Sequence, residues 1–470
     1  MTTLNTELCF KSVAQLNELY ASAEASPVDV VQASLGKIDL DDGVYNAMCL
    51  VDHEGAIEAA KLSEKRWQKG EPLSPLDGVP ATIKDLILTK GWPTLRGSLT
   101  IDAEADGPWD EDAPAVEKLR RAGAILMGKT TTPEFGSKGV TDSPLTGITR
   151  NAHNPERTSG GSSGGAAVAA ARGYAVLNIG TDGAGSVRIP ASFNGIYGLK
   201  PTFGRVPAYP LSPLGTVSHQ GPMTRTVEDA ASLLSIISQP DDRDWYALPY
   251  DGCQYEEGLE SSLEGLKIAW SKDLGYADVS DEVANTCKQA VSLFEQAGAI
   301  VEEIEGPLGR DPIWITDRLW FFGFLKITSS MTPEDIAKMD PMQTEMYERA
   351  CKLTASEIIE AQGAREEVAL KLCHVHREYD LLVTPTMPQT AFTAGQFNPW
   401  GSDLSDDWIR WSSFSYPFNQ SQQPAATCPC GFDTDGMPIG LQIVGPKYED
   451  QLVLKASRAF EKLANVSTHT

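Results

Sequence analysis

The sequence predicts a single large α/β domain over residues 1–470, with helices covering both faces of a mixed, mostly parallel, twisted sheet. The first observation is a rhythm of helix pattern, glycine and short apolar strand that recurs in both halves of the chain. The second is that no fixed-period repeat, low-complexity tract or long linker divides the sequence. The third is composition, because 41% hydrophobic and 22% charged residues are typical of a globular protein with a sizeable core.

Helices alternate with short strands along the first part of the chain. Ser26 followed by Pro27 is a favoured pair for the cap and first position of a helix. Asp77 and Gly78 predict a turn, and the apolar residues after it predict a strand that ends at Lys84. Helices are expected over 12–21, 26–38, 56–69, 113–122 and 164–172, and further strands over 124–127 and 174–179.

The second half repeats this rhythm. The polar stretches near 240–262 and 392–407 are interpreted as excursions from one domain. Strands are expected over 266–270, 299–304, 381–384 and 439–444, and helices over 281–297, 356–379 and 451–463.

Charge and cysteine usage exclude several classes of protein. A net charge of −25 argues against direct binding to nucleic acid or to anionic membranes, which requires Lys and Arg. Eight scattered cysteines without a C-x-x-C pair, and a start without the pattern of a secretory signal, favour a cytoplasmic protein. No run of about 18 apolar residues predicts a membrane span. The oligomeric state stays open, and a homodimer is compatible with the sequence.

A first glycine-rich turn surrounds Ser162. Gly160, Ser162 and Gly164 fit the pattern of an α/β-hydrolase nucleophile elbow, but the polar residues before them do not predict the strand that an elbow needs. No G-K-[ST] follows, so the turn is not a phosphate-binding loop. A flexible linker is the alternative interpretation. The helix pattern that follows at once favours a structured, anion-stabilising loop.

A second turn, T-D-G-A-G-S, surrounds Ser186 and follows an apolar strand pattern. Its small residues would expose successive backbone N–H groups, which an oxyanion hole requires. The alternative is an ordinary glycine turn with a capping serine. Asp182 and Arg188 flank the turn, and a buried ion pair that fixes its shape is the favoured interpretation over two solvent-facing side chains.

Lys84 is the candidate base, because its strand would carry it out of apolar surroundings. A single lysine is usually exposed, but burial would lower its pKa and make the neutral amine a base. No metal and no cofactor are expected, since Cys428 and Cys430 lack zinc ligands at suitable spacing. The histidines suggest no triad, because they lie in polar, turn-like or terminal contexts or diverge on one helix: His53, His153, His219, His469, His374 and His376.

An aromatic run at helical spacing comprises Trp314, Trp320, Phe321, Phe322 and Phe324. Core packing is the default for such a run. The alternative is that part of it, Trp314 to Phe322, forms the wall of a hydrophobic pocket for an acyl or aryl group.

Taken together, these motifs resemble the amidase signature family of serine hydrolases over nearly the whole chain. Their ordered combination is highly specific. The matching stretches are G-V-P-A-T-I-K-D around Lys84, G-G-S-S-G-G at 160–165, G-T-D-G-A-G-S-V-R-I-P-A-S at 180–192, G-L-K-P-T at 198–202, and M-P-I-G-L-Q-I-V-G-P at 437–446.

The resemblance implies a catalytic core over about 75–225. Within it Ser186 would be the nucleophile, Ser162 a bridging serine and Lys84 the base. It also implies a cis peptide between Gly161 and Ser162. The oxyanion hole would consist of the N–H groups of Gly183, Ala184, Gly185 and Ser186. Ala184 departs from the glycine of many relatives, and its methyl group is expected to narrow the leaving-group side of the pocket.

The function expected from this resemblance is that of a stand-alone cytoplasmic amidase. It would hydrolyse carboxamides, anilides or related carbamates to an acid and ammonia or an amine. One alternative is the glutamine-hydrolysing subunit of a tRNA-dependent amidotransferase, in which Arg365 would bind glutamine. Residues 271–279 look more like free-standing amidases. The other alternative is a catalytically inactive binding protein on the same fold.

Overall fold

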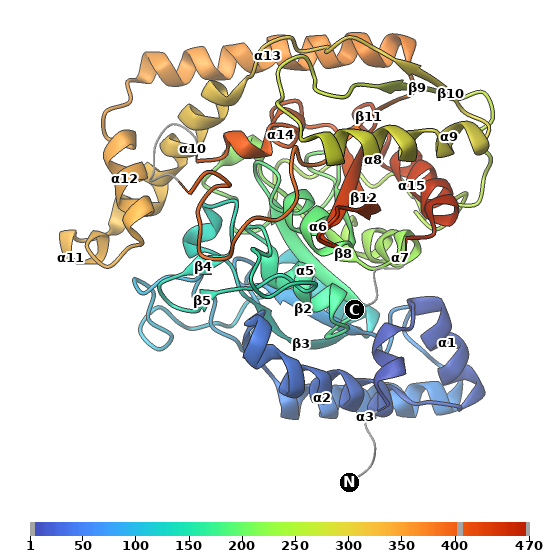
Figure 1. The fold of residues 1–470 in the computed structure, drawn as a ribbon. Coiled ribbons are helices and arrows are strands. Elements are labelled where there is room, and N and C mark those ends of the chain that lie inside the picture. Colours follow the sequence, from blue (N-terminus) through green and yellow to red (C-terminus); the bar gives the residue numbers. More distant parts are fainter. Residues whose placement is uncertain (1–4, 402–407, 467–470) are drawn as a thin grey trace.

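The computed structural model describes residues 5–401 and 408–466 of the 470-residue chain. His469 and the end of the 392–407 stretch therefore lie outside the described residues. A long central sheet runs through the molecule, with the helices from α1 (Val13–Ser22) to α3 (His53–Lys69) along one side and α13 (Ala355–Glu378) across the opposite side (Figure 1). Among the described residues, no helix is both long and apolar enough to cross a membrane.

Within the described residues the main sheet has 11 strands in the order β1-β3-β2-β6-β8-β7-β12-β13-β11-β9-β10. The small pair β4 (Asp142–Ser143) and β5 (Gly147–Ile148) forms a separate sheet. The strands of the main sheet are β1 Met48–Val51, β2 Pro80–Lys84, β3 Ile125–Thr130, β6 Leu177–Asp182, β7 Tyr197–Lys200, β8 His219–Thr224, β9 Lys267–Trp270, β10 Ile300–Glu303, β11 Leu381–Pro385, β12 Ala425–Phe432 and β13 Pro438–Val444.

The predicted mixed sheet, with helices on both faces, is confirmed. Its parallel part lies in two blocks, β3-β2-β6 and β11-β9-β10. The strands between the blocks, from β8 to β13, pair antiparallel with their neighbours. The sequence does not predict β7, β8 or β12, because glycine and proline interrupt their apolar pattern.

Helices cover both faces of the sheet. On one face α4 (Pro114–Ala122), α7 (Val227–Ile237) and α15 (Asp450–Ala464) pack on apolar side chains of the sheet. On the other, α2 (Pro27–Tyr45), α3 (His53–Lys69), α5 (Gly164–Ala171) and α6 (Arg188–Asn194) form a second core. The remaining helices are α1 Val13–Ser22, α8 Asp281–Val291, α9 Leu293–Gln296, α10 Ile313–Ile327, α11 Pro333–Ile336, α12 Pro341–Ala350, α13 Ala355–Glu378 and α14 Pro417–Gln420.

Short 3-10 helices complete the structure at Thr6–Phe10, Glu134–Gly136, Gly215–Val217, Thr328–Ser330 and Arg410–Ser412. The single helix expected over 281–297 divides into α8 and α9 at Ser292. The Ser292 hydroxyl donates to the Gln289 carbonyl at 2.7 Å, and such local bonds compete with the helical ladder.

Helix α5 (Gly164–Ala171) consists only of Gly, Ala and Val, and all of its residues are buried. A Cβ at Gly164 would lie 2.4 Å from the Ser159 hydroxyl, and one at Gly165 would lie 2.5 Å from the Ala47 carbonyl. The small side chains therefore let this helix lie directly on the sheet. That close packing fixes the position of the serine turn at its N-terminus.

Candidate active site

Two neighbouring parallel strands bring the site residues together. Strand β2 pairs with β6, with Ile83 opposite Ile179, so Lys84 and Thr181 lie at the same carboxyl edge. In α/β sheets ligands bind outside the carboxyl ends of the strands. The Ser162 turn leads into α5, and the Ser186 turn joins β6 to α6. A backbone bond from Ser163 N–H to the Ser186 carbonyl, 3.2 Å, ties the two turns together.

The Lys84 amine lies among three hydroxyl groups. Its Nζ is 2.7 Å from Ser162 Oγ, 2.9 Å from Ser163 Oγ and 2.9 Å from Thr181 Oγ1. The side chain is fully buried, and among the described residues it has no ion-pair partner. Burial holds the pKa of Lys84 well below its usual value, although the charge of Asp182 opposes this. The amine is therefore in the environment that favours its neutral form.

A neutral amine has two N–H groups and one lone pair. The Ser163 hydroxyl donates to the Thr181 carbonyl at 3.1 Å, so its oxygen accepts from Lys84. The Ser162 hydroxyl can therefore donate to the amine's lone pair. This arrangement allows Lys84 to withdraw the proton of Ser162.

Ser162 and Ser186 both line one cavity and are 1% and 5% exposed. The peptide between Gly161 and Ser162 is cis, as the family resemblance implies. Among the described residues, Ser162 Oγ contacts Lys84, whereas the Ser186 hydroxyl has no hydrogen-bond partner. The Ser162 and Ser186 hydroxyl groups do not form a hydrogen bond with each other in this structure. Catalytic hydrogen bonds often tighten only when substrate binds.

The turn before Ser186 is shaped by the carboxylate of Asp182. Asp182 accepts from the Gly185 N–H at 2.7 Å and from the Val187 N–H at 3.2 Å. The expectation that Gly185 contributes an oxyanion donor is therefore wrong, because its N–H already has a partner. Within the described part of the chain, the N–H groups of Gly183, Ala184 and Ser186 have no acceptor.

Asp182 and Arg188 form an ion pair in which both side chains are fully buried. Arg188 Nε lies 2.9 Å from one carboxylate oxygen of Asp182, and Nη2 lies 3.0 Å from the other. Burial alone would raise the pKa of Asp182, but the Arg188 charge and hydrogen bonds outweigh it and the pKa is lowered. The carboxylate is therefore ionised and can hold the turn.

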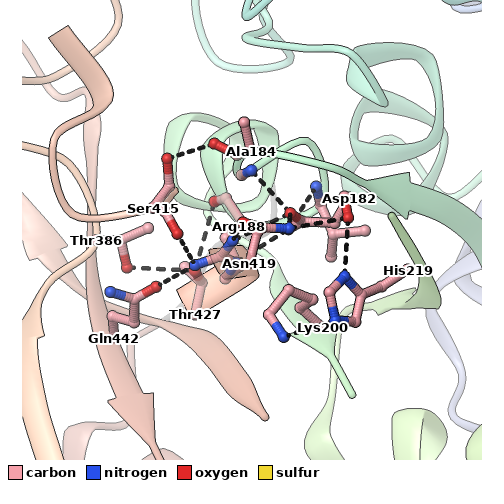
Figure 2. Close-up of polar contacts among 12 residues, drawn as sticks. Asp182, Ala184, Arg188, Lys200, His219, Thr386, Ser415, Asn419, Thr427 and Gln442 are labelled. Atoms are coloured by element: carbon pink, nitrogen blue, oxygen red, sulfur yellow. Dashed lines mark hydrogen bonds and ion pairs between the residues drawn. The ribbon is translucent and has the colours of Figure 1, made fainter. Parts of the chain in front are cut away.

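The C-terminal part of the chain satisfies the other donors of Arg188 (Figure 2). Arg188 donates to Asn419 Oδ1 at 2.6 Å, to Gln442 Oε1 at 2.8 Å and to the Ser415 carbonyl at 2.9 Å. The Ser415 hydroxyl donates to the Ala184 carbonyl at 2.6 Å. These contacts tie the second serine turn to the C-terminal part of the chain.

The cavity beside the two serines has a volume of about 980 Å³. Of the predicted pocket residues, Trp320 and Phe322 line it, whereas Trp314 and Phe321 do not. Trp314 packs against the guanidinium of Arg318, and Phe321 is buried behind the cavity wall in the apolar cluster that also contains Trp320. Neighbouring residues of a helix point in different directions, so one face of α10 cannot present all four rings.

Two further expectations about the pocket are wrong. The Ala184 methyl group does not line the cavity but packs in the cluster with Trp320 and Phe193, so it does not narrow the leaving-group side. Arg365 lies outside the cavity, and its guanidinium donates to the Gln420 carbonyl and to Thr216 Oγ1. It is not placed to bind a glutamine substrate beside Ser186.

Sequence reasoning missed several partners of the site. Ser163 follows Ser162 and Thr181 precedes Asp182, and both lie within the family motifs. Their position in these motifs could have indicated a role in the site. Gln442 also lies in a matching stretch, but its contact with Arg188 spans 254 positions and has no local pattern. His219 is buried beside Lys200, with 3.3 Å between their nitrogens, and not in the polar or turn-like context that was expected.

The sheet, the two serine turns and the buried lysine form the arrangement of an amide-hydrolysing enzyme, and comparison with known proteins supports that class. The profile of the Amidase family matches residues 29–454, and the chain belongs to this family, the amidase signature enzymes. The predicted family resemblance is thereby confirmed.

Individual relatives include both stand-alone enzymes and one component of a larger complex. The chain is 36% identical to an acylamidase of Rhodococcus erythropolis, over 96% of this chain and 94% of that one. It is 31% identical to a glutamyl-tRNA(Gln) amidotransferase subunit of Chloroflexus aurantiacus, over 98% of both. A bacterial aryl acylamidase has a TM-score of 0.90 at 30% identity, covering 98% of this chain and 97% of its own. The peptide amidase of Stenotrophomonas maltophilia has a TM-score of 0.83 at 26% identity, over 97% of both chains.

Proposed function

We propose that the chain is a stand-alone amidase that cleaves carboxamides, anilides or related amides and carbamates through an acyl-enzyme on Ser186. The observation that carries this proposal is the hydrogen bond between the buried Lys84 amine and Ser162 Oγ, 2.7 Å. A desolvated neutral amine beside a hydroxyl is a base that works without histidine, in a variant of triad logic.

The first half of the reaction is a proton relay coupled to bond formation. Lys84 takes the proton of Ser162, and Ser162 takes the proton of Ser186 as Ser186 Oγ attacks the amide carbonyl. The developing oxyanion would accept from the unpaired N–H groups of Gly183, Ala184 and Ser186, which replace water as donors. A tetrahedral intermediate results.

The second half releases the amine and then the acid. The proton on Lys84 returns through Ser162 to the leaving nitrogen, so the carbon–nitrogen bond breaks and ammonia or an amine departs. Water, deprotonated by the same relay, then attacks the acyl-enzyme and restores Ser186. The products are a carboxylic acid and ammonia or an amine.

The cavity is large and has Trp320 and Phe322 in its wall. Such a cavity favours substrates with an aryl or acyl group over glutamine, the substrate of the amidotransferase alternative. The similarity to an acylamidase and an aryl acylamidase agrees with this proposal. A cytoplasmic location fits the eight cysteines, all of which are free thiols.

The test is a panel of amides, anilides, carbamates and esters with the purified single chain, in the absence of ATP and of any partner. Wild type should hydrolyse at least one amide, and Ser186→Ala should lose about a thousandfold or more in kcat. If the chain hydrolyses no substrate other than glutamine, and does so only when a partner is added, the amidotransferase alternative is favoured. Equal turnover by both proteins would refute the assignment of Ser186.

A further inference from the structure

Arg96 is a cation in the wall of the catalytic cavity that the proposed reaction does not use. Its side chain lines the cavity together with Leu86, Phe135 and Ser162. No hydrogen bond or ion pair within the described residues involves its guanidinium group. An arginine of this kind has up to five N–H donors left for a ligand.

The backbone of Arg96 is held firmly beside the catalytic groups. Its backbone N–H faces the carboxylate of Asp85, the residue after Lys84. Its carbonyl accepts from the Phe135 N–H at 2.8 Å, and the next residue, Gly136, adjoins Ser162 Oγ. Arg96 is thus tied both to the strand of the base and to the segment beside the bridging serine.

The conformation of Arg96 also points to a function. Its φ is +56°, in the left-handed region that residues other than glycine rarely adopt. Such residues cluster at active sites and ligand clamps. Burial lowers the pKa of Arg96 from its usual value, although the charges of Asp85 and Asp106 oppose this.

The acidic residues of the cavity wall differ from Arg96, because the chain itself occupies their carboxylates. Asp106 accepts from the Asp102 N–H at 2.7 Å, and Asp244 accepts from the N–H groups of Ala208 and Tyr246. Asp335 caps a helix through Thr332. These hydrogen bonds occupy carboxylate oxygens but leave the charges in place, so Arg96 differs from these residues in that, within the described residues, its charged group keeps all its donors for a ligand.

We propose that the substrate of this amidase carries a carboxylate besides the scissile amide, and that Arg96 binds that carboxylate in the catalytic cavity. This inference rests on the proposed function. An arginine fork matches the two oxygens of a carboxylate and binds it with charge-assisted hydrogen bonds. The carboxylate could belong to the acyl part or to the leaving amine.

Pairs of substrates with and without a carboxylate show whether the carboxylate belongs to the acyl part or to the leaving amine. In the acyl arm, para-nitroanilides of succinic, glutaric and adipic acid are compared with uncharged straight-chain acyl para-nitroanilides of equal length. In the amine arm, para-acetamidobenzoate is compared with acetanilide. Each pair is assayed with wild type, Arg96→Gln, Arg96→Lys and the control Lys288→Gln. Lys288 is an exposed cation on α8, away from the cavity, so its variant controls for the change in net charge.

In at least one arm, wild type should prefer the carboxylate-bearing member. Arg96→Gln should lower kcat/KM for that member about 10- to 100-fold, mainly through KM, and leave the uncharged member within about twofold. Arg96→Lys should restore part of the loss, and Lys288→Gln should match wild type. No preference in either arm, or an equal loss for both members of a pair, would overturn the inference.

Binding of the same substrate pairs to Ser186→Ala is measured by titration calorimetry. It distinguishes failure of the proposed function from failure of the Arg96 inference alone. If Ser186→Ala still turns over substrate, the proposed function fails and the inference falls with it. If turnover requires Ser186 but the carboxylate binds no better to Ser186→Ala than to Ser186→Ala/Arg96→Gln, only the inference fails. Tighter binding that depends on Arg96 supports it.

Discussion

The Nζ of Lys84 lies 2.7 Å from Ser162 Oγ, at a site where the described residues offer the amine hydroxyl groups instead of a carboxylate partner. A lysine with an adjacent carboxylate would stay charged and could not accept a proton. Here desolvation favours the neutral amine, and the geometry directs its lone pair at Ser162. The pH dependence of catalysis follows from this pair.

The acid limb of the pH profile should report Lys84. An amine with a lowered pKa is neutral above that pKa, so activity is present there and is lost as the pH falls through it. We expect kcat/KM to reach its plateau well below pH 10.5, the ordinary value for lysine. Lys84→Arg, which cannot deprotonate, should lose about a thousandfold or more at every pH. A limb near pH 10.5 would contradict the proposed neutral base.

Arg188 should matter far more for folding than exposed arginines do. Arg188→Met leaves the buried Asp182 carboxylate without its cation, and breaking a buried pair in this way costs about 3–5 kcal/mol. The matched control is Arg121→Met, because Arg121 is 78% exposed and its pair with Glu117 should contribute about 1 kcal/mol or less. Denaturant unfolding of both variants measures the difference. Similar losses in the two proteins would exclude a structural role for the Asp182–Arg188 pair.

Gly185 and Ala184 should respond in opposite ways to substitution. Gly185 has φ +123°, and an added Cβ would lie 2.5 Å from the Ser415 side chain. Gly185→Ala should therefore destabilise the protein by about 1–3 kcal/mol and strongly lower kcat, because the turn that holds Ser186 must move.

Ala184→Gly is the control for this pair. It removes a methyl group outside the cavity and keeps the backbone donors, so kcat/KM should stay within about threefold of wild type. Steady-state kinetics and thermal unfolding distinguish the two variants. Full activity of Gly185→Ala would show that the turn tolerates a side chain.

Asp229 should make stability depend on pH. Burial raises its pKa to about 6, so the folded chain holds a proton that the unfolded chain releases near its ordinary value of 3.8. The stability from this carboxyl group is therefore lost as the pH rises from 3.8 to about 6. Asp229→Asn keeps an acceptor for the Val13 N–H, which Asp229 binds at 2.8 Å.

Relative to wild type, Asp229→Asn should gain about 2–3 kcal/mol between pH 4 and pH 7. Urea unfolding of both proteins at several pH values measures this difference. A constant difference across that range would mean that Asp229 does not titrate there.

Local sequence patterns predicted the parts of the fold that local physics decides. Ser26 caps α2 as expected, and β2 ends at Lys84 as expected, because capping and apolar runs act within a few residues. The antiparallel strands β7, β8 and β12 escaped prediction because glycine and proline interrupt their apolar pattern, and their register depends on distant partners. The pairing of Ala425 with Lys200, for example, has no trace in either strand alone.

The site followed the same division. Lys84, Ser162 and Ser186 could be singled out from their motifs, but the partners that fix them could not. Asn419 donates a hydrogen bond to Asp182 although the two residues are 237 positions apart in the sequence, so only the folded chain brings them together. The error over Gly185 has a similar origin, because a glycine turn does not reveal which N–H groups a carboxylate will occupy.

The most direct test of the central claim is covalent labelling of the nucleophile. Wild type, Ser162→Ala and Ser186→Ala are treated with a fluorophosphonate and analysed by intact mass and peptide mapping. If Ser186 is the nucleophile, wild type should carry one adduct, located at Ser186, Ser162→Ala should be labelled more slowly, and Ser186→Ala should carry none. An adduct of equal yield on Ser186→Ala, or one mapped to another residue of wild type, would contradict this assignment.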